Sequence, residues 1–164
     1  MATGVLQKGL AEEVWLMPCK RNPLKDEPAL MSDEERLEML SRAISYCAVN
    51  KNEHRLKICN EELGMPTPSY TYDTFQSLRK KYPEHNFRLL VGADSYLDFK
   101  RWYKWEWLEK NLRPLVYPRP GYELGELRPD WTLIENVDTV DISSTEIRDI
   151  IKRNLSVIEY LPWM

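Results

Sequence analysis

The stretch "DISSTEIRDII" contains the residue types that bind phosphate groups. Ser143, Ser144 and Thr145 stand directly before a short amphipathic helix, and Arg148 follows Ser144 by one helical turn, on the same face. Ser143 and Glu146 match a capping box, which needs only one hydroxyl. The other hydroxyls and the guanidinium would converge on the positive end of the helix dipole. A plain helix cap is the simpler interpretation, and the surplus of donors favours a phosphate site.

Two further stretches carry residues suited to a ligand. In "GADS", Gly92 lets a backbone approach without a Cβ, and Asp94 can accept hydrogen bonds from hydroxyls or an amine. An ordinary loop is the alternative. In "FKRWYKWEWL", Trp102 and Trp105 are three residues apart, so they are predicted to share a helix face. Such a pair packs in a core or stacks on a heterocycle, a contact worth about 1–3 kcal/mol for a nucleobase.

Short apolar runs that alternate with helical patterns must position these residues. The predicted strands are residues 14–17, 56–59, 87–91, 115–117 and 131–134. The predicted helices are residues 32–48, 72–81, 101–109 and 144–153. The first should begin with a capping box of Ser32 and Glu35, and the second should turn Phe75 and Leu78 inward. This alternation predicts an α/β, Rossmann-like fold with a mostly parallel sheet and helices on both faces. Ligands of such sheets bind beyond the carboxyl ends of the strands, where "PCKRNPLK", "GADS", "PRPG" and "DISSTEIR" are expected.

Composition narrows the class of protein. The 164 residues, 30% charged and 43% hydrophobic, predict a single domain over residues 1–164. No apolar run is long enough to span a bilayer and no signal peptide is recognisable, so we expect a cytoplasmic protein without a membrane partner. The cysteines at 19, 47 and 59 match neither a disulfide framework nor, with His54, a common zinc spacing, so no metal site is predicted.

The net charge of −3 disfavours a dedicated nucleic-acid binder. Local basic clusters nevertheless occur at residues 20–25 and 100–104. Binding of single-stranded nucleic acid through Trp102, Trp105 and the nearby lysines is therefore kept as an alternative, and the main prediction includes no nucleic-acid partner.

Taken together and in this order, these stretches resemble the bacterial nicotinate mononucleotide adenylyltransferases. The matching segments are "EVWLMPCKRNPLK", "PSYTYDTFQSLRKKYP", "FRLLVGADSYLDFKRW", "DISSTEIRDIIKRN" and the closing "VIEYLP". The resemblance runs from about Leu10 to the end of the chain. It implies transfer of AMP from ATP to nicotinate mononucleotide, giving deamido-NAD and pyrophosphate, with Mg²⁺ accompanying the ATP phosphates.

The resemblance also implies roles for individual residues. Trp102 would stack on the nicotinate ring, and Lys25 would lie near the substrate phosphate in a loop shaped by Asn22. The pyridine-nucleotide site would be formed by the "SYTYDT" stretch, with Tyr70, Thr71, Asp73 and Thr74. The ATP site would be formed by Gly92, Asp94, Ser143, Ser144, Thr145 and Arg148, of which Ser144 and Arg148 would act on the reacting phosphates.

One family feature does not occur in this sequence. Members begin with a strand that leads into a Gly-rich turn and a His-x-x-His pair, whereas this chain begins "MATGVLQKGLAEEVW", similar to the second half of the helix after that turn. We therefore expect a chain without the first, central strand, the phosphate-binding turn and the main catalytic histidines. Loss of one oxyanion-type donor typically costs about 10²–10³ in rate, so the resemblance leaves the activity of this polypeptide open.

Three alternatives remain at this stage. The acceptor could be another phosphorylated compound, such as phosphopantetheine or a sugar-alcohol phosphate. The chain could be an inactive nucleotide-binding or assembly module, or the single-strand binder described above. The sequence leaves open the choice between the acid and the amide mononucleotide, and the oligomeric state, homo-oligomer included.

Overall fold

The structure is a computed structural model that describes residues 1–19, 31–51, 53–139, 142, 144–153 and 156. Its helices are α1 (Ala2–Gln7), α2 (Asp33–Lys51), η1 (Glu61–Gly64), α3 (Thr71–Lys81), α4 (Ala93–Leu97), η2 (Phe99–Arg101), α5 (Trp105–Leu112) and α6 (Ser144–Lys152). Its strands are β1 (Val14–Leu16), β2 (Leu56–Ile58), β3 (Leu90–Gly92), β4 (Leu115–Tyr117) and β5 (Thr132–Leu133).

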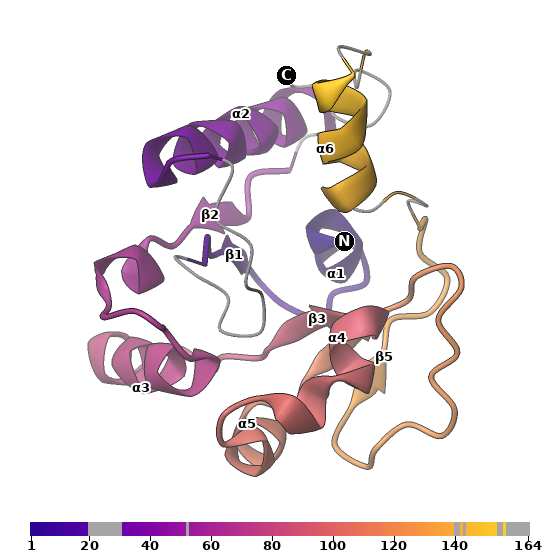
Figure 1. Cartoon of the computed structure of the whole chain (residues 1–164). Helices are drawn as coiled ribbons and strands as arrows, with labels where there is room; N and C mark the ends of the chain where they lie inside the picture. The colour runs from indigo at the N-terminus through magenta and orange to yellow at the C-terminus, as the bar shows by residue number, and fades with distance from the viewer. Residues whose placement is uncertain (20–30, 52, 140–141, 143, 154–155, 157–164) are drawn as a thin grey trace.

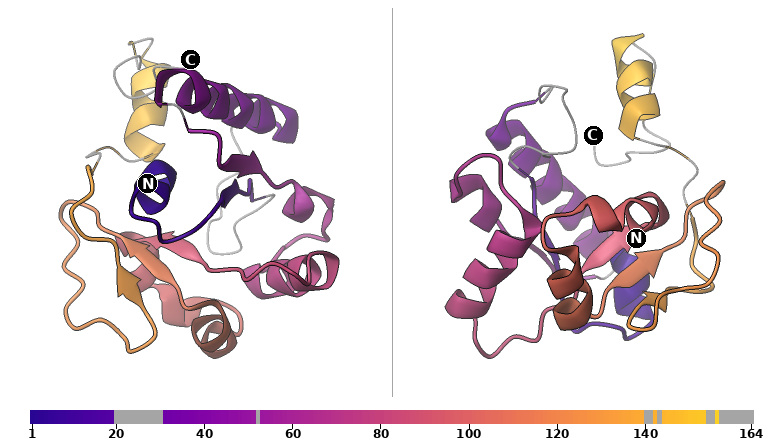
Figure 2. Two further views of the ribbon diagram at one scale, coloured as in Figure 1. Left: turned by 180° about the vertical axis from the view of Figure 1, so that it is seen from behind. Right: turned by 60° about the horizontal axis from the view of Figure 1, so that its bottom comes forward.

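All strand pairs are parallel, as the alternation of strands and helices predicts. β1 pairs with β2, while β3, β4 and β5 form a second sheet in that order. Helices α1, α2 and α6 lie on one side of the strands, and α3 and α5 lie on the other (Figures 1 and 2). The expected single sheet is thus divided in two, because within the described part of the chain no hydrogen-bonded ladder joins β1 to β3.

The two sheets nevertheless share their hydrophobic cores. Val14 of β1 and Leu90 of β3 pack against the core that contains Val5 of α1. Their chain neighbours Trp15 and Val91 belong to the core on the α3 and α5 side. Since successive side chains of a strand point to opposite faces, β1 and β3 present the same two faces to the same two layers. Side-chain packing therefore holds β1 and β3 in one layer.

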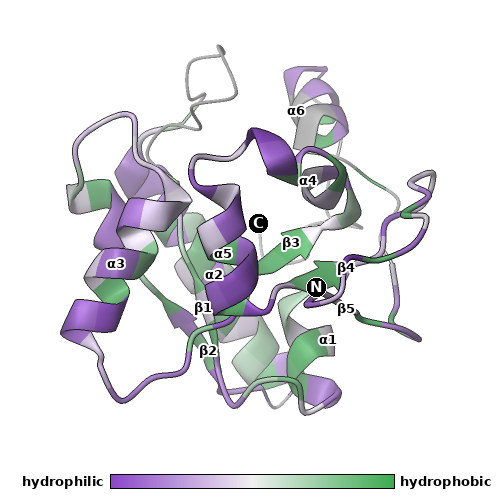
Figure 3. Ribbon diagram, turned by 90° about the horizontal axis from the view of Figure 1, so that it is seen from below, coloured by the Kyte–Doolittle hydropathy of each residue, from purple (hydrophilic) through white to green (hydrophobic). Residues whose placement is uncertain are grey.

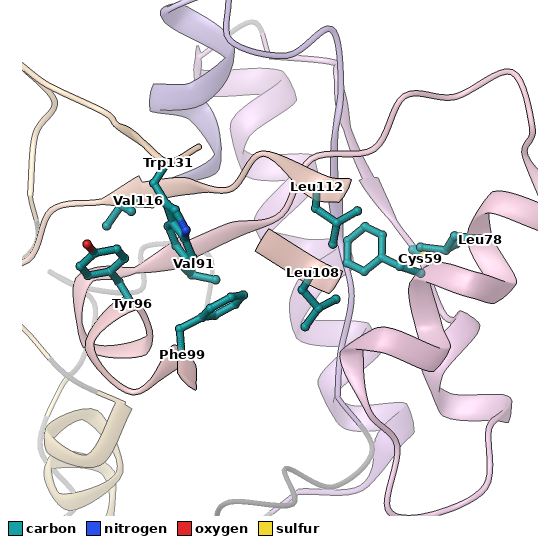
Figure 4. Close-up of a cluster of buried hydrophobic side chains, with 10 residues drawn as sticks. Cys59, Leu78, Val91, Tyr96, Phe99, Leu108, Leu112, Val116 and Trp131 are labelled. Atoms are coloured by element: carbon teal, nitrogen blue, oxygen red, sulfur yellow. The ribbon is translucent and has the colours of Figure 1, made fainter. Parts of the chain in front are cut away.

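The larger core is rich in aromatic rings. Phe99 is fully buried, and its ring centre lies 4.6 Å from that of Trp131, which in turn lies 4.8 Å from Tyr96. Figure 4 shows these rings beside Val91 and Val116, one from each of two paired strands. This cluster fixes α4 and η2 against the sheet.

The predicted helices begin and end for recognisable reasons. At the start of α2, the Ser32 amide donates to Glu35 and the Glu35 amide donates to the Ser32 hydroxyl, which confirms the capping box. Phe75 and Leu78 of α3 are buried, as predicted. In Figure 3, β3, β4 and α1 are largely hydrophobic, whereas α3 carries both colours. α3 therefore buries only one of its faces.

The segment around residue 101 differs from the sequence prediction. A helix was predicted over residues 101–109, but α5 begins only at Trp105, because Lys104 adopts a left-handed conformation with φ 52°. Trp102 is extended after η2, so it does not share a helix face with Trp105. α4 was not predicted, and β3 begins three residues later than predicted. The chain consequently turns between Trp102 and Lys104.

Cys19, Cys47 and Cys59 are not joined by a disulfide. No helix in the described ranges combines the length and apolar character needed to cross a membrane.

Candidate functional site

The carboxyl ends of β3 and β4 bring together a carboxylate and a guanidinium. Asp94 lies two residues after β3 and Arg119 two residues after β4. Because these strands pair in parallel, their carboxyl ends meet at one edge. The Asp94 carboxylate lies 3.1 Å from a guanidinium nitrogen of Arg119, and the side chains are 41% and 28% exposed. The edge thus presents a charged pair that remains accessible to a ligand.

Gly92 lies directly beneath the side chains of Asp94 and Arg119. A Cβ built on Gly92 would lie 2.5 Å from Oδ1 of Asp94 and 3.4 Å from Cδ of Arg119. Its backbone is extended, with φ −76°, so left-handed freedom is not the reason for the glycine. The missing side chain allows the Asp94 carboxylate to fold back over the end of β3.

The connection between β4 and β5 is anchored to α4. The buried Tyr96 hydroxyl donates to the carbonyl of Glu126 at 3.4 Å and accepts from the amide of Arg128 at 3.2 Å. The Arg128 guanidinium lies 3.4 Å from Glu109 and 5.1 Å from the centre of the Tyr96 ring. These contacts hold the connection that carries Arg119 against the helix that carries Asp94.

A second group of residues gathers at the start of α3. The ring of Tyr103 lies 4.9 Å from that of Tyr70 and 5.8 Å from that of Tyr72. The Lys104 ammonium lies 4.4 Å from the centre of the Tyr72 ring, and the Tyr103 and Tyr72 phenols raise the pKa of Lys104. The structure therefore joins the predicted "SYTYDT" stretch to the residues that directly follow Trp102.

Trp102 itself is half-buried beside the core. Its ring centre lies 5.2 Å from that of Phe99, with the planes tilted by 38°. The contact covers part of the indole and orients it. The predicted stacking on a pyridine ring remains a prediction.

The predicted residues of α3 have different surroundings. Thr71 and the exposed Asp73 lie in the first turn, near the positive end of the helix dipole. Thr74 is 1% exposed, and its hydroxyl donates to the carbonyl of Tyr70 at 3.2 Å. Thr74 thus holds the segment from inside and does not offer its hydroxyl to a ligand.

A buried hydrogen bond attaches the segment before α3 to η1. The Ser69 hydroxyl donates to the carboxylate of Glu62 at 2.6 Å, and both residues are buried. η1 is thereby attached to the residue that precedes Tyr70. Neither Glu62 nor Ser69 stood out in the sequence.

The predicted phosphate site is described only in part. Asn22, Lys25 and Ser143 lie outside the described residues. Ser144, Thr145 and Arg148 are described through the backbone of α6, which begins at Ser144. The predicted convergence of these side chains with Gly92 therefore stays a prediction.

Sequence reasoning missed Arg119, Tyr72, Tyr103 and Lys104. The available signal for Arg119 was its place in "PRPG", directly after a predicted strand. For Tyr103 and Lys104 the signal was their adjacency to Trp102. Their contacts with α3 depend on the left-handed turn at Lys104, which the helical pattern did not indicate.

The two histidines of the chain are far from this edge along their strands. His54 precedes β2 and His85 precedes β3, so both are placed toward the amino ends of the strands. His85 stacks on Phe87 with 5.7 Å between ring centres. In the described part of the chain, no group of three or more His, Cys, Asp or Glu side chains is arranged to hold a metal ion.

Comparisons with known proteins agree with this layout. Residues 1–150 match the family described as cytidylyltransferase-like. The probable nicotinate-nucleotide adenylyltransferase of Bacteroides fragilis is 32% identical over 92% of this chain and 72% of its own length. A counterpart from Bacillus anthracis is 34% identical over 92% of this chain and 76% of its own length. The solved Plasmodium falciparum nicotinic acid mononucleotide adenylyltransferase complexed with NaAD has a TM-score of 0.65 at 19% identity, covering 90% of this chain and 73% of that one.

Proposed function

Since this chain belongs to the cytidylyltransferase-like family and is homologous to the nicotinate-nucleotide adenylyltransferases, we propose that it transfers AMP from ATP to nicotinate mononucleotide. In this reaction a phosphate oxygen of the mononucleotide attacks the α-phosphorus of ATP. The bond from that phosphorus to the bridging oxygen breaks, and pyrophosphate leaves with the electron pair. The products are deamido-NAD (NaAD) and pyrophosphate, the last step before amidation in NAD biosynthesis.

The observation that carries this proposal is the Asp94–Arg119 pair beside Gly92. Phosphoryl and nucleotidyl transfer depend on positioning and on stabilisation of charge, because the protein forms no covalent bond with the substrate. Arg119 presents guanidinium donors at the carboxyl edge, where anionic phosphates bind in this class of sheet. Asp94 holds the guanidinium in place and offers its second oxygen to a hydroxyl or amino group of the nucleotide.

The aromatic group at α3 supports the choice of acceptor. Tyr70 and Tyr72 pack against Tyr103, the residue that follows Trp102 in the chain, and Thr71 opens α3 at the same place. A helix start with free amides suits the nicotinate carboxylate, and the flat indole of Trp102 suits the pyridine ring. The complex of the Plasmodium falciparum protein with NaAD supports the same ligand class.

The other residues that the family resemblance implies would complete the proposed site. Ser144, Thr145 and Arg148 at the start of α6, together with Ser143, would bind the triphosphate. Lys25 and Asn22 would lie near the acceptor phosphate. Mg²⁺ would arrive as the complex of ATP, whose phosphates would bind it.

The test is a pyrophosphate-release assay on the chain with ATP, Mg²⁺ and nicotinate mononucleotide. Parallel reactions contain nicotinamide mononucleotide, phosphopantetheine or a sugar-alcohol phosphate in its place. Pyrophosphate with the nicotinate compound, accompanied by deamido-NAD in the product analysis, is the expected result. Turnover with a different acceptor only would show that the substrate assignment is wrong.

A second candidate is a nucleotide-binding module without turnover. The placement of His54 and His85 toward the amino ends of the strands favours it, because neither imidazole is at the carboxyl edge. Calorimetry with deamido-NAD distinguishes the two candidates. Binding without any pyrophosphate release supports the module, and measurable turnover by the chain excludes it.

A further inference from the structure

A hollow of about 640 Å³ lies on the edge of the sheet opposite to the proposed active site. Its lining is formed by residues 86–88, which precede β3, residues 110–113, which end α5 and lead into β4, and residues 129–132, which lead into β5. Because β3, β4 and β5 are parallel, the segments before them gather at the amino edge. Asp94 and Arg119 follow the strands and occupy the carboxyl edge, so the hollow is a separate place on the molecule.

Three cations line this hollow. Arg88, Lys110 and Arg113 accompany a single carboxylate, Asp130, so the lining is net positive. Among the described residues, no Asp or Glu lies within ion-pair distance of any of these three cations. The side-chain amides of Asn86 and Asn111 also line it and add neutral hydrogen-bond donors.

The guanidinium of Arg88 is held in a defined orientation by neutral acceptors. Its Nε donates to the carbonyl of Arg113 at 3.0 Å, and a terminal nitrogen donates to the hydroxyl of Thr132 at 3.3 Å. An arginine has five N–H donors, so three remain for a ligand. Orientation by backbone and hydroxyl leaves the positive charge of Arg88 without a balancing carboxylate.

Arg88 and Arg113 also repel each other. Burial lowers the pKa of Arg88, and the positive charge of Arg113 lowers it further by a smaller amount. Arg113 is itself in a left-handed conformation, with φ 40°, a backbone state that few arginines adopt. Two like charges that face one hollow raise the free energy of the protein without a ligand, and an anion bound between them would remove this repulsion.

We propose that this hollow is a second anion site, which binds a small oxyanion of the phosphate class between Arg88 and Arg113. Guanidinium groups match the planar and tetrahedral oxygens of phosphates with paired hydrogen bonds, and Lys110 adds a mobile charge at the rim. The volume accommodates phosphate or pyrophosphate with bridging water. Asp130 on the same lining disfavours long polyanions such as a nucleic-acid backbone.

The test uses inorganic pyrophosphate and inorganic phosphate as probes on the full chain, without nucleotide. Affinity is measured by calorimetry, and each arginine is then labelled with phenylglyoxal and quantified by peptide mass spectrometry. At a pyrophosphate concentration ten times its Kd, Arg88 and Arg113 should label about tenfold more slowly, from mass action alone. Arg42, an exposed residue of α2 paired with Glu38, serves as the internal reference and should label at an unchanged rate.

Protection of Arg119 without protection of Arg88 and Arg113 would place the anion at the other edge and overturn the proposal. The absence of saturable binding by either probe would overturn it as well.

The variant Arg113→Asn separates an anion site from a structural role. Asn tolerates the left-handed conformation, and the backbone carbonyl of residue 113 can still accept the hydrogen bond from Arg88. Removal of one of two repelling charges should keep or raise the melting temperature without anion, and should weaken pyrophosphate binding about tenfold, the effect of losing one charge-assisted hydrogen bond. Arg42→Gln should bind pyrophosphate as the wild type does. A lower melting temperature of Arg113→Asn, with unchanged pyrophosphate affinity, would make Arg113 a structural residue and contradict the proposal.

Discussion

The Asp94 carboxylate lies 3.1 Å from the Arg119 guanidinium, although the two residues follow different strands. Gly92 makes this approach possible, since a Cβ at that position would collide with the same carboxylate. The parallel pairing of β3 and β4 places the two loop starts side by side, and the aromatic core under α4 fixes their separation. The contact between Asp94 and Arg119 therefore depends on the pairing of the strands and not on local sequence.

We expect Arg119→Gln to lower kcat/KM for adenylyl transfer by roughly 10²-fold, because the proposed function makes Arg119 a charged donor to the reacting phosphates. The melting temperature should change little, since exposed ion pairs contribute little to stability. Arg101→Gln is the matched control: Arg101 pairs with Asp98 at 3.5 Å, and both side chains are more than half exposed. An equal loss of activity in both variants would argue against a specific role for Arg119. Assays of pyrophosphate release and thermal unfolding decide this.

Gly92→Ala should displace the Asp94 carboxylate and reduce kcat/KM about tenfold through the lost positioning. Stability should change little, because the colliding atom is the end of a partly exposed, flexible side chain. The matched control is Gly64→Ala in η1, where an added Cβ meets no atom within 4 Å. Urea unfolding and steady-state kinetics are measured on both variants. If Gly92→Ala has the same kcat/KM as Gly64→Ala, the close approach of Asp94 to the strand end does not contribute to activity.

Much of this fold follows from local sequence patterns. Phe75 and Leu78 were predicted to face inward because they are three residues apart on one helix, and both are buried. The capping box of Ser32 and Glu35 depends on neighbouring residues alone, and it forms. Short apolar runs likewise predicted the five strands found among the described residues, since the choice between helix and strand is decided within each run.

The features that were missed are those that local patterns do not encode. A lysine has no intrinsic preference for the left-handed conformation, so the local sequence does not indicate the break at Lys104. This break makes the predicted helix over residues 101–109 wrong in its first half. The partner of Asp94 depends on β4 lying next to β3, which is a non-local fact. The division into two sheets is non-local in the same way.

Trp102→Leu should raise KM for nicotinate mononucleotide roughly tenfold, the value of one lost aromatic stacking contact, and change KM for ATP little. Leu still packs against Phe99, so the core contact is largely retained. Trp102→Phe keeps a flat ring and should recover most of the affinity. Equal rises in both Michaelis constants would mean that Trp102 supports the site only through packing.

The attachment of α3 to η1 gives a pH-dependent stability. The Glu61 carboxylate accepts from the Lys81 ammonium at 2.8 Å and from the Ser77 hydroxyl at 2.7 Å. Both bonds lower the pKa of Glu61 from its usual value of 4.5, and the bond from Lys81 has the larger effect. Glu61 in turn raises the pKa of Lys81. The folded state therefore favours ionised Glu61. This contribution to stability is present above pH 4.5 and is lost as the pH falls through the lower, folded-state pKa.

Lys81→Met should accordingly lower the free energy of unfolding by a small amount at neutral pH. The difference from the wild type should disappear well below pH 4.5, where Glu61 is protonated in both proteins. The pair is also lost in strong alkali, as the pH rises through the raised pKa of Lys81. The neighbouring Lys80→Met removes the same charge from α3 without touching Glu61, and it should leave the pH dependence as in the wild type. Urea unfolding of the three proteins across the acid range measures this. A difference for Lys81→Met that persists unchanged into acid would mean that the aliphatic part of the side chain, and not its charge, is what attaches α3 to η1.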